Sequence, residues 1–141
     1  EFKLRYMADF HEYAKELRKT RPNLIIGGDY NICHEPIDIH DPVRLKNVSG
    51  FLPVEREWLS EFIDSGFTDS FRHLNPDLEQ YSWWSYRARD WDAADKGRRL
   101  DHVWVTPPLK KSLKSAGVLR EARGWERASD HAPVIVDFNL A

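Results

Sequence analysis

The fold is decided by a short stretch near the amino terminus, LIIGGDYN at residues 24–31. Its first five residues are apolar or glycine, which is the pattern of a short strand that is buried on both faces. Asp29 and Asn31 follow at the end of this run, two residues apart. In an extended segment, side chains two residues apart face the same side. The stretch therefore predicts a buried strand that ends in two neighbouring polar side chains.

Two further motifs place polar side chains near the ends of predicted strands. RLDHVWV, at residues 99–105, carries Asp101 within an alternating pattern, and SDHAPVIVDF, at residues 129–138, places Asp130 and His131 directly before the last predicted strand. Only His131 among these has a usable neutral form near pH 7. Carboxylates, an amide and one imidazole together suit a hard metal ion and phosphate-ester chemistry. We therefore expect five side chains to converge: Asp29, Asn31, Asp101, Asp130 and His131.

The segment before the first strand predicts an amphipathic helix over residues 2–20. Apolar side chains recur there at spacings of three and four, and we expect the stripe to be buried: Phe2, Tyr6, Phe10, Tyr13 and Leu17, with Met7 and Ala14 beside it. A second helix is expected to begin at Pro53 and to end at Gly66, residue types that favour these positions. The alternation of helices and strands predicts mixed α and β layers, an α+β fold.

The segments between these elements are less regular. Residues 32–53 have no periodicity and predict a long loop, and such loops inside a compact domain are usually functional. Asp69 is expected to cap a short helix over residues 70–74. Residues 77–98 mix aromatic and charged side chains and predict a strand followed by a polar loop. A further short strand is expected at residues 118–119.

The composition describes a single domain with its own core. The 141 residues are 41% hydrophobic and 31% charged, with a net charge of -2. Cys33 is the single cysteine, which excludes an intrachain disulfide and fits a reducing compartment, so we expect a cytoplasmic protein. No stretch is long and apolar enough to cross a bilayer, and we expect no membrane partner.

The charge distribution leaves room for a nucleic-acid partner. A net charge of -2 argues against a generic nucleic-acid coat, but basic residues predominate within residues 87–99 and 107–127. A polyanion could bind such a locally positive face. On composition alone, an ordinary charged and solvated surface is an equally good explanation.

The three polar motifs are similar, in order, to the carboxy-terminal motifs of the exonuclease III family of DNA-repair nucleases. Three more segments also resemble that family: residues 49–58, 66–72 and 81–87, which read SGFLPVEREW, GFTDSFR and YSWWSYR. The family belongs to the endonuclease/exonuclease/phosphatase superfamily. The resemblance implies a DNase I-like fold, a four-layer α/β/β/α sandwich. Residues 1–141 would be the carboxy-terminal half of that single domain, one mixed sheet with flanking helices.

The same resemblance implies a missing half. Family members carry an earlier Asn and an earlier Glu, and the Glu is a main metal ligand. Neither has a counterpart here, because the chain begins, without Met, where that half would end. We therefore expect the chain alone to be inactive and the inner face of its sheet to be uncovered. The missing half, a second copy of the chain or another partner would cover that face.

With the resemblance, each site residue has an expected role in phosphodiester hydrolysis. Asp29 would orient and deprotonate the attacking water, and Asn31 would donate to a phosphoryl oxygen. His131 would contact the scissile phosphate as an imidazolium, while Asp101 accepts from its other ring nitrogen. Asp130 is a candidate ligand, directly or through water, for Mg²⁺ or Mn²⁺.

Ordinary structural roles are the alternatives for these residues. Asp29 could bond to its own turn, and Asp130 could cap the turn before the last strand nearly as readily as it could bind a metal. His131 could be a satisfied core histidine. Arg99 competes with His131 as the partner of Asp101.

Trp83 and Arg87 resemble the family's DNA-contacting positions. The implied partner is double-stranded DNA with abasic sites or 3′ ends. Because Trp83 and Trp84 face opposite sides of a strand, one of them is expected in the core. The family commonly has Trp or Leu where this chain has Arg98, which leaves a preference for abasic sites open.

The resemblance therefore implies part of a magnesium-dependent DNA-repair nuclease with abasic-site endonuclease and 3′-to-5′ exodeoxyribonuclease activities. One alternative is another phosphodiesterase or phosphatase of the superfamily, acting on RNA tails, phosphoinositides or sphingomyelin. The other is a non-catalytic half-domain that serves as a binding or assembly module. Activity measured on a panel of these substrates distinguishes the first alternative from a DNA-repair nuclease. Titration with Mg²⁺ or Mn²⁺ tests the second, because a non-catalytic half-domain would bind neither ion even with the missing half supplied.

Overall fold

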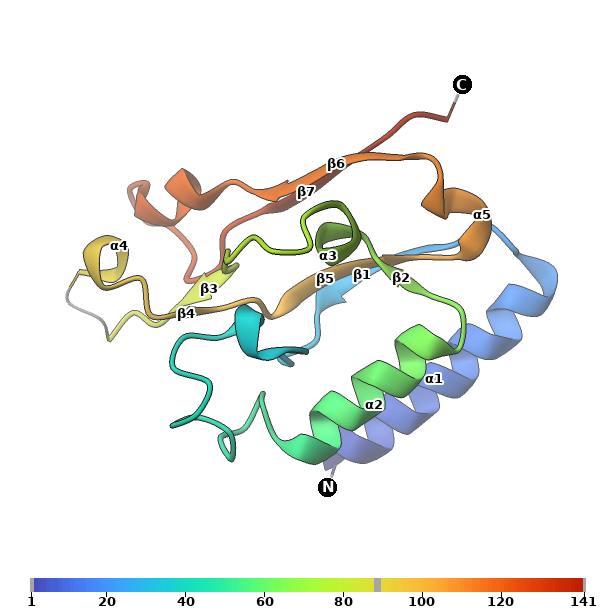
Figure 1. The fold of residues 1–141 in the computed structure, drawn as a ribbon, viewed down its shortest axis with the longest axis horizontal. Coiled ribbons are helices and arrows are strands. Elements are labelled where there is room, and N and C mark those ends of the chain that lie inside the picture. Colours follow the sequence, from blue (N-terminus) through green and yellow to red (C-terminus); the bar gives the residue numbers. More distant parts are fainter. Residues whose placement is uncertain (1, 88–89, 141) are drawn as a thin grey trace.

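The computed structural model describes residues 2–87 and 90–140 and has the expected α+β class (Figure 1). Its helices are α1 Phe2–Thr20, α2 Pro53–Asp64, α3 Ser70–Leu74, α4 Trp91–Ala94 and α5 Pro107–Lys110, with 3₁₀ turns at Pro36–Asp38 and Arg120–Gly124. Its strands are β1 Ile25–Asp29, β2 Thr68–Asp69, β3 Trp83–Trp84, β4 Gly97–Arg98, β5 Asp101–Val105, β6 Leu113–Val118 and β7 Val134–Phe138.

The described strands form three antiparallel sheets, in the orders β1-β5-β2, β3-β4 and β6-β7. This arrangement differs from the single mixed sheet that we expected. Strands β2, β3 and β4 have only two residues each, which is too short to continue a ladder. Helix α3 contacts both β5 and β6, and it lies between them in Figure 1. The β6-β7 hairpin therefore packs beside β5 without joining its sheet.

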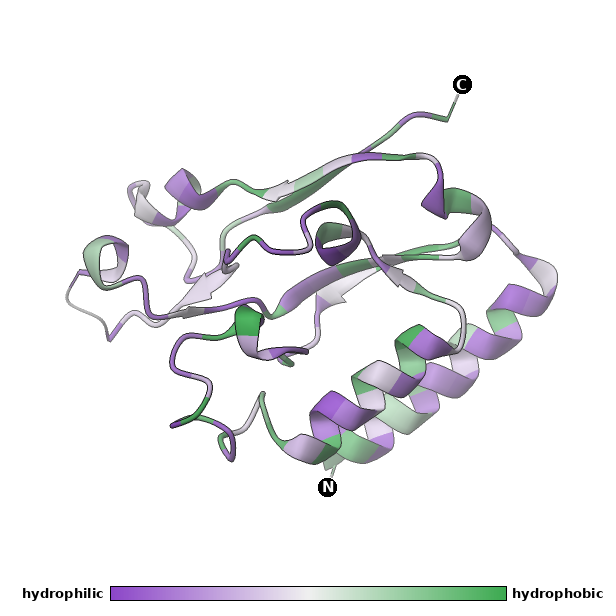
Figure 2. Ribbon diagram, in the orientation of Figure 1, coloured by the Kyte–Doolittle hydropathy of each residue, from purple (hydrophilic) through white to green (hydrophobic). Residues whose placement is uncertain are grey.

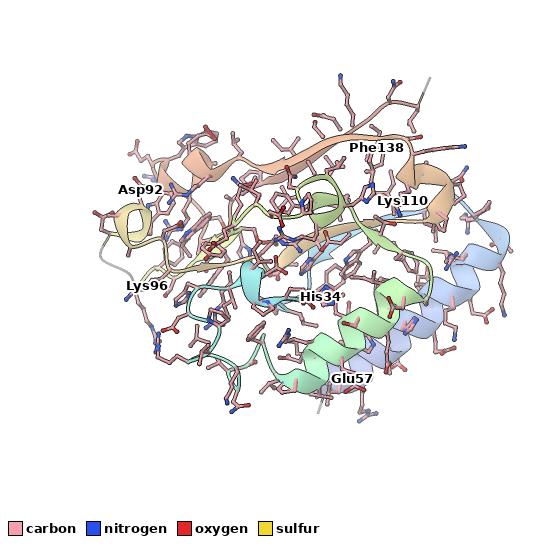
Figure 3. All side chains as sticks on the ribbon, viewed as in Figure 1. His34, Glu57, Asp92, Lys96, Lys110 and Phe138 are labelled. Atoms are coloured by element: carbon pink, nitrogen blue, oxygen red, sulfur yellow. The ribbon has the colours of Figure 1, made fainter. Side chains whose placement is uncertain are left out.

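Helices α1 and α2 form a layer over the β1-β5-β2 sheet (Figure 1). Apolar and polar residues alternate along both helices (Figure 2), and side chains fill the space between the helices and the strands (Figure 3). The core between the layers contains Met7, Ala14, Leu59, Phe62 and Trp104. None of the helices in the described ranges combines the length and the apolar character that crossing a bilayer requires.

The buried face of α1 differs from the predicted stripe. Met7 and Ala14 are buried, whereas Phe2, Tyr6 and Tyr13 are exposed. Both sets of residues recur at helical spacing, so periodicity alone did not select the face. The small side chain of Ala14, rather than the large aromatic ring of Tyr13, meets the core.

Strand β1 is not buried on both faces, which corrects the expectation for residues 24–28. Ile26 packs against the core below the helices, but Ile25 is 51% exposed. On β7, Ile135 is 47% exposed. Apolar strand residues are thus left without a covering layer among the described residues. The sequence pattern was that of a strand buried on both faces. Among the described residues, only one face of β1 is buried, by the helices.

The long loop predicted over residues 32–53 is confirmed, and its apolar residues form a second core cluster. Cys33, Ile39, Leu45 and Phe51 pack there together with Leu100. Burial raises the pKa of the Cys33 thiol to about 12, so this thiol is protonated and unreactive at neutral pH. The loop is therefore held by its own hydrophobic contacts.

A buried ion-pair cluster joins this loop to β5. The Arg99 guanidinium, only 1% exposed, donates to Asp38 Oδ1 at 2.8 Å and to Asp69 Oδ2 at 2.6 Å. Burial acts to raise the pKa of both carboxyls, but the charge and the hydrogen bonds of Arg99, together with smaller contributions from other neighbours, hold both pKa values below the usual range. Asp69 also accepts the Arg72 N–H at 3.3 Å, which confirms that Asp69 caps α3.

Candidate active site

The predicted convergence of the strand ends is present. Asp29, the last residue of β1, lies opposite Asp101, the first residue of β5, in the antiparallel ladder. An isolated bridge between His131 and Trp83 brings the segment before β7 to the same place. As a result, His131 Nδ1 lies 2.8 Å from Asp101 Oδ2, and His131 Nε2 lies 3.5 Å from Asp29 Oδ2. The imidazole is held between two carboxylates.

Ser82, a buried residue, hydrogen-bonds to Asp101 and so stabilises the Asp101–His131 pair. The Ser82 hydroxyl donates to Asp101 Oδ2 at 2.7 Å and accepts the backbone N–H groups of Leu100 and Asp101 at 3.0 and 3.2 Å. The Ser82 carbonyl accepts the Ala132 N–H at 2.8 Å. Ser82 thus ties the start of β5 to the residue after His131. Arg99 binds Asp38 and Asp69 instead, so it is not the partner of Asp101.

Asn31 lies beside Asp29, but not through strand alternation. Its φ of 53° is left-handed, and its N–H donates to Asp29 Oδ1 at 2.9 Å. The extended geometry that we expected is therefore wrong, because β1 ends at Asp29 and the chain turns there. Asp29 and Asn31 still line the same hollow of about 560 Å³, together with Gly50 and Arg98. A second hollow of about 500 Å³ is lined by Asp29, Asp101 and His131, so Asp29 borders both hollows.

One carboxylate oxygen of Asp130 faces the cluster, and the other accepts a hydrogen bond from Trp83. Its Oδ2 accepts the Trp83 Nε1–H at 3.0 Å, and its Oδ1 lies 4.0 Å from His131 Nε2. Trp84 is buried, so it is the member of the tryptophan pair that belongs to the core. The Arg98 guanidinium lies 5.5 Å from the centroid of the Trp83 ring and covers part of that ring.

Arg87 is exposed and lies at the edge of the described residues, next to residues 88–89. Its backbone N–H donates to Ser85 Oγ at 3.1 Å. The DNA-contacting roles expected of Arg87 and Trp83 stay predictions.

The donor chemistry of the cluster fits a hard divalent ion. Within the described ranges, Asp29, Asp101 and His131 form a group whose ligand atoms all lie within 4.8 Å of one another. Asp101 and His131 already bind each other, and Asp29 Oδ2 and Asp130 Oδ1 lie 3.5 and 4.0 Å from His131 Nε2. Carboxylate oxygens without a thiolate cluster suit Mg²⁺ or Mn²⁺.

Two contributions to this site were not foreseen from the sequence. Ser82 lies between aromatic residues in the segment YSWW, which gave no sign that its hydroxyl would reach Asp101. Lys3, in the first turn of α1, donates to the Asn31 carbonyl at 2.8 Å. Both contacts join residues that are far apart in the sequence, 19 and 28 positions respectively.

Comparison with known proteins gives a consistent result. The family model described as Endonuclease/Exonuclease/phosphatase family matches residues 2–131. An exodeoxyribonuclease of Bacillus subtilis is 38% identical over 99% of this chain and 54% of its own length. A Neisseria 3′ phosphatase, solved with a product DNA hairpin, superposes with a TM-score of 0.94 at 32% identity, over 99% of this chain and 54% of that one.

An AP endonuclease of Archaeoglobus fulgidus superposes with a TM-score of 0.91 at 30% identity, again over 99% of this chain and 54% of that one. These structures confirm the expected DNase I-like fold class. The chain spans about half the length of the relatives that it matches. With its fold, its site and the match over residues 2–131 in agreement, the chain belongs to the endonuclease/exonuclease/phosphatase family.

Proposed function

We propose that this chain is the carboxy-terminal portion of a Mg²⁺-dependent DNA-repair nuclease that cuts beside abasic sites and trims 3′ ends. The observation that carries the proposal is the imidazole of His131 between Asp29 and Asp101, at 3.5 and 2.8 Å. The activities named for the similar proteins, an exodeoxyribonuclease, an AP endonuclease and a 3′ phosphatase, support DNA ends and abasic sites as substrates. The cytoplasmic location stays a prediction.

The proton chemistry follows from the geometry of the cluster. Because a carboxylate only accepts, the Nδ1–H of His131 donates to Asp101, which fixes the ring orientation. The 3.5 Å between His131 Nε2 and Asp29 Oδ2 is too long for a good hydrogen bond, so each atom is available to a substrate. His131 Nε2 then binds a phosphoryl oxygen, and Asp29 deprotonates the attacking water.

The remaining site residues bind and orient. The Asn31 amide donates to a second phosphoryl oxygen, and Asp130, oriented by Trp83, would hold a divalent ion. Such an ion would supply positive charge to neutralise the phosphoryl group. Trp83 and Arg87 contact the DNA duplex, the first by packing and the second by pairing with phosphate. Arg98 adds positive charge to the hollow beside Asp29.

The exposed apolar strand residues support a requirement for the other half of the domain. Ile25 of β1 and Ile135 of β7 are both about half exposed, and a sheet surface of this kind is normally covered. The described residues also offer few ligands to a divalent ion, because Asp101 and His131 already bind each other. We propose that an amino-terminal half supplies both the cover and the missing ligand.

We expect this chain alone, with Mg²⁺, to cut a duplex containing one abasic site at a rate near background. The reason is that a metal site with too few ligands binds the ion weakly. Incision is measured for the chain, for the separate amino-terminal half and for the two together. Activity that appears only in the mixture, and that Asp29→Asn in this chain removes, supports the proposal. Full-rate incision by the chain alone would defeat it.

A further inference from the structure

Lys3 makes an unusual ion pair for a lysine in the first turn of a helix. Its Nζ lies 2.5 Å from Oε2 of Glu55, a residue of α2 that is only 2% exposed. The other Lys–Glu pairs of α1, Lys15–Glu12 and Lys19–Glu16, are local and solvent-exposed. Such exposed pairs contribute little, whereas a buried carboxylate requires a partner. The Lys3–Glu55 pair therefore has a fixed geometry.

Glu55 is held independently of Lys3. Its Oε1 accepts the N–H groups of Gly50 and Leu52 at 2.8 and 3.1 Å. The Gly50 carbonyl in turn accepts the Cys33 N–H at 2.8 Å, which ties this loop to the segment after Asn31. Gly50 has a φ of 95°, and a Cβ added there would lie 3.2 Å from the Asn31 carbonyl oxygen. Glu55 is thus an anchor for the loop that packs against Asn31.

The same lysine reaches the active site. Lys3 Nζ donates to the Asn31 carbonyl at 2.8 Å, and the Asn31 N–H donates to Asp29 Oδ1 at 2.9 Å. Asn31 has a left-handed φ of 53°, a conformation that asparagine adopts more readily than most residues other than glycine. Its two backbone hydrogen bonds, one to each side, hold it in that conformation.

We propose that Lys3 and Glu55 are positioning residues for catalysis: the Glu55-anchored ammonium fixes the Asn31 carbonyl and thereby orients the Asn31 amide and the Asp29 carboxylate. This inference rests on the proposed function, in which Asn31 and Asp29 act on the phosphodiester. Lys3 lines the same hollow as these two residues. Its effect is on the turnover number, because a misplaced catalytic group lowers the rate even when substrate still binds.

The test compares Lys3→Met and Glu55→Gln in the complete protein, on a duplex with one abasic site. Glu55→Gln keeps an oxygen for the Gly50 and Leu52 N–H groups but removes the charge that holds Lys3. We expect kcat to fall about 10- to 100-fold in each variant, with KM changed less than about threefold. Lys3→Arg, which retains a cationic donor, recovers most of the loss. Lys19→Met removes an exposed pair of the same helix and keeps full activity.

Coupling to Asn31 separates positioning from a general loss of stability. If Lys3 acts through Asn31, the double variant Lys3→Met/Asn31→Ala loses much less activity than the product of the two single losses. Multiplicative losses, together with a lowered Tm and a raised KM, would show that the pair is merely structural and would overturn the proposal.

Amide hydrogen exchange tests the contact without reference to activity. We expect the Asn31 N–H to exchange faster in Lys3→Met and Glu55→Gln, while the Ile26 N–H in β1 keeps its protection. An unchanged Asn31 exchange rate would contradict the positioning role. If the unmodified complete protein does not cut DNA, the proposed function fails on that result, and the exchange rates alone decide whether Lys3 fixes Asn31.

Discussion

Replacement of Asp29 with Asn lowers the rate at which the complete protein cuts an abasic duplex by about 10²- to 10⁴-fold, the range for loss of a general base. An amide cannot take a proton from water at neutral pH. The substitution is nearly isosteric, and the remaining amide oxygen can still accept the Asn31 N–H that Asp29 Oδ1 accepts at 2.9 Å. The local turn is therefore kept, and the lost rate reports the carboxylate itself.

Single-turnover incision is the suitable measurement, because product release then does not mask the chemical step. The matched control is Asp9→Asn, which makes the same chemical change at an exposed position of α1 and leaves the rate within about twofold. The Tm of both variants should match that of the unmodified protein. Retained turnover in Asp29→Asn would remove Asp29 from the role of base.

Replacement of Arg99 with Met lowers the free energy of unfolding by about 3–5 kcal/mol, the usual cost of removing one partner from a buried ion pair. The Arg99 guanidinium is 1% exposed and binds Asp38 and Asp69 at 2.8 and 2.6 Å. Asp38 keeps Arg72 as a partner at 2.5 Å, whereas Asp69 is left as a buried carboxylate without its cation. Urea unfolding of the complete protein at pH 7 measures the loss.

The pH dependence of this loss has a definite sign. In the unmodified protein, Arg99 holds the pKa of Asp69 below its ordinary value of 3.8. The stabilisation is therefore present above about pH 4 and is lost as the pH falls through the lowered value. In Arg99→Met, burial without the cation raises the pKa of Asp69 above its unfolded value. The variant therefore regains stability as the pH falls from 7 toward 4.

Arg44→Met is the matched control for Arg99→Met. Arg44 pairs with Asp41 at 2.7 Å on the surface, and removal of such an exposed pair changes the stability little. A loss of similar size in the two variants, or a deficit of Arg99→Met that grows as the pH falls from 7 toward 4, would contradict the assignment of Arg99 as a buried structural hub.

The candidate site could be predicted from the sequence because its residues lie at strand ends. The apolar run before Asp29 and the alternating pattern around Asp101 fix where the two strands terminate, and an antiparallel ladder then places those residues opposite each other. The motif around His131 predicted the third residue of the cluster, next to Asp29 and Asp101. Convergence thus follows from local patterns together with the pairing rules of strands.

Other features depend on contacts that no local pattern contains. The hydroxyl of Ser82 contacts Asp101, which lies 19 residues further along the chain. Lys3 of α1 forms an ion pair with Glu55 of α2. Ile25 is 51% exposed, so its apolar pattern indicated more burial than the chain itself provides. The left-handed turn at Asn31, a conformation that asparagine tolerates, is held by hydrogen bonds to Lys3 and Asp29.

The central claim is that the cluster of Asp29, Asp101, Asp130 and His131 acts, with a divalent ion, on a DNA phosphodiester. The most direct measurement is incision of a duplex with one abasic site by the complete protein, as Mg²⁺ is removed with EDTA and then restored. We predict that incision stops in EDTA, returns with Mg²⁺, and is not restored in Asp29→Asn. Incision that continues in EDTA, or a duplex that stays intact at every Mg²⁺ concentration, would contradict the account.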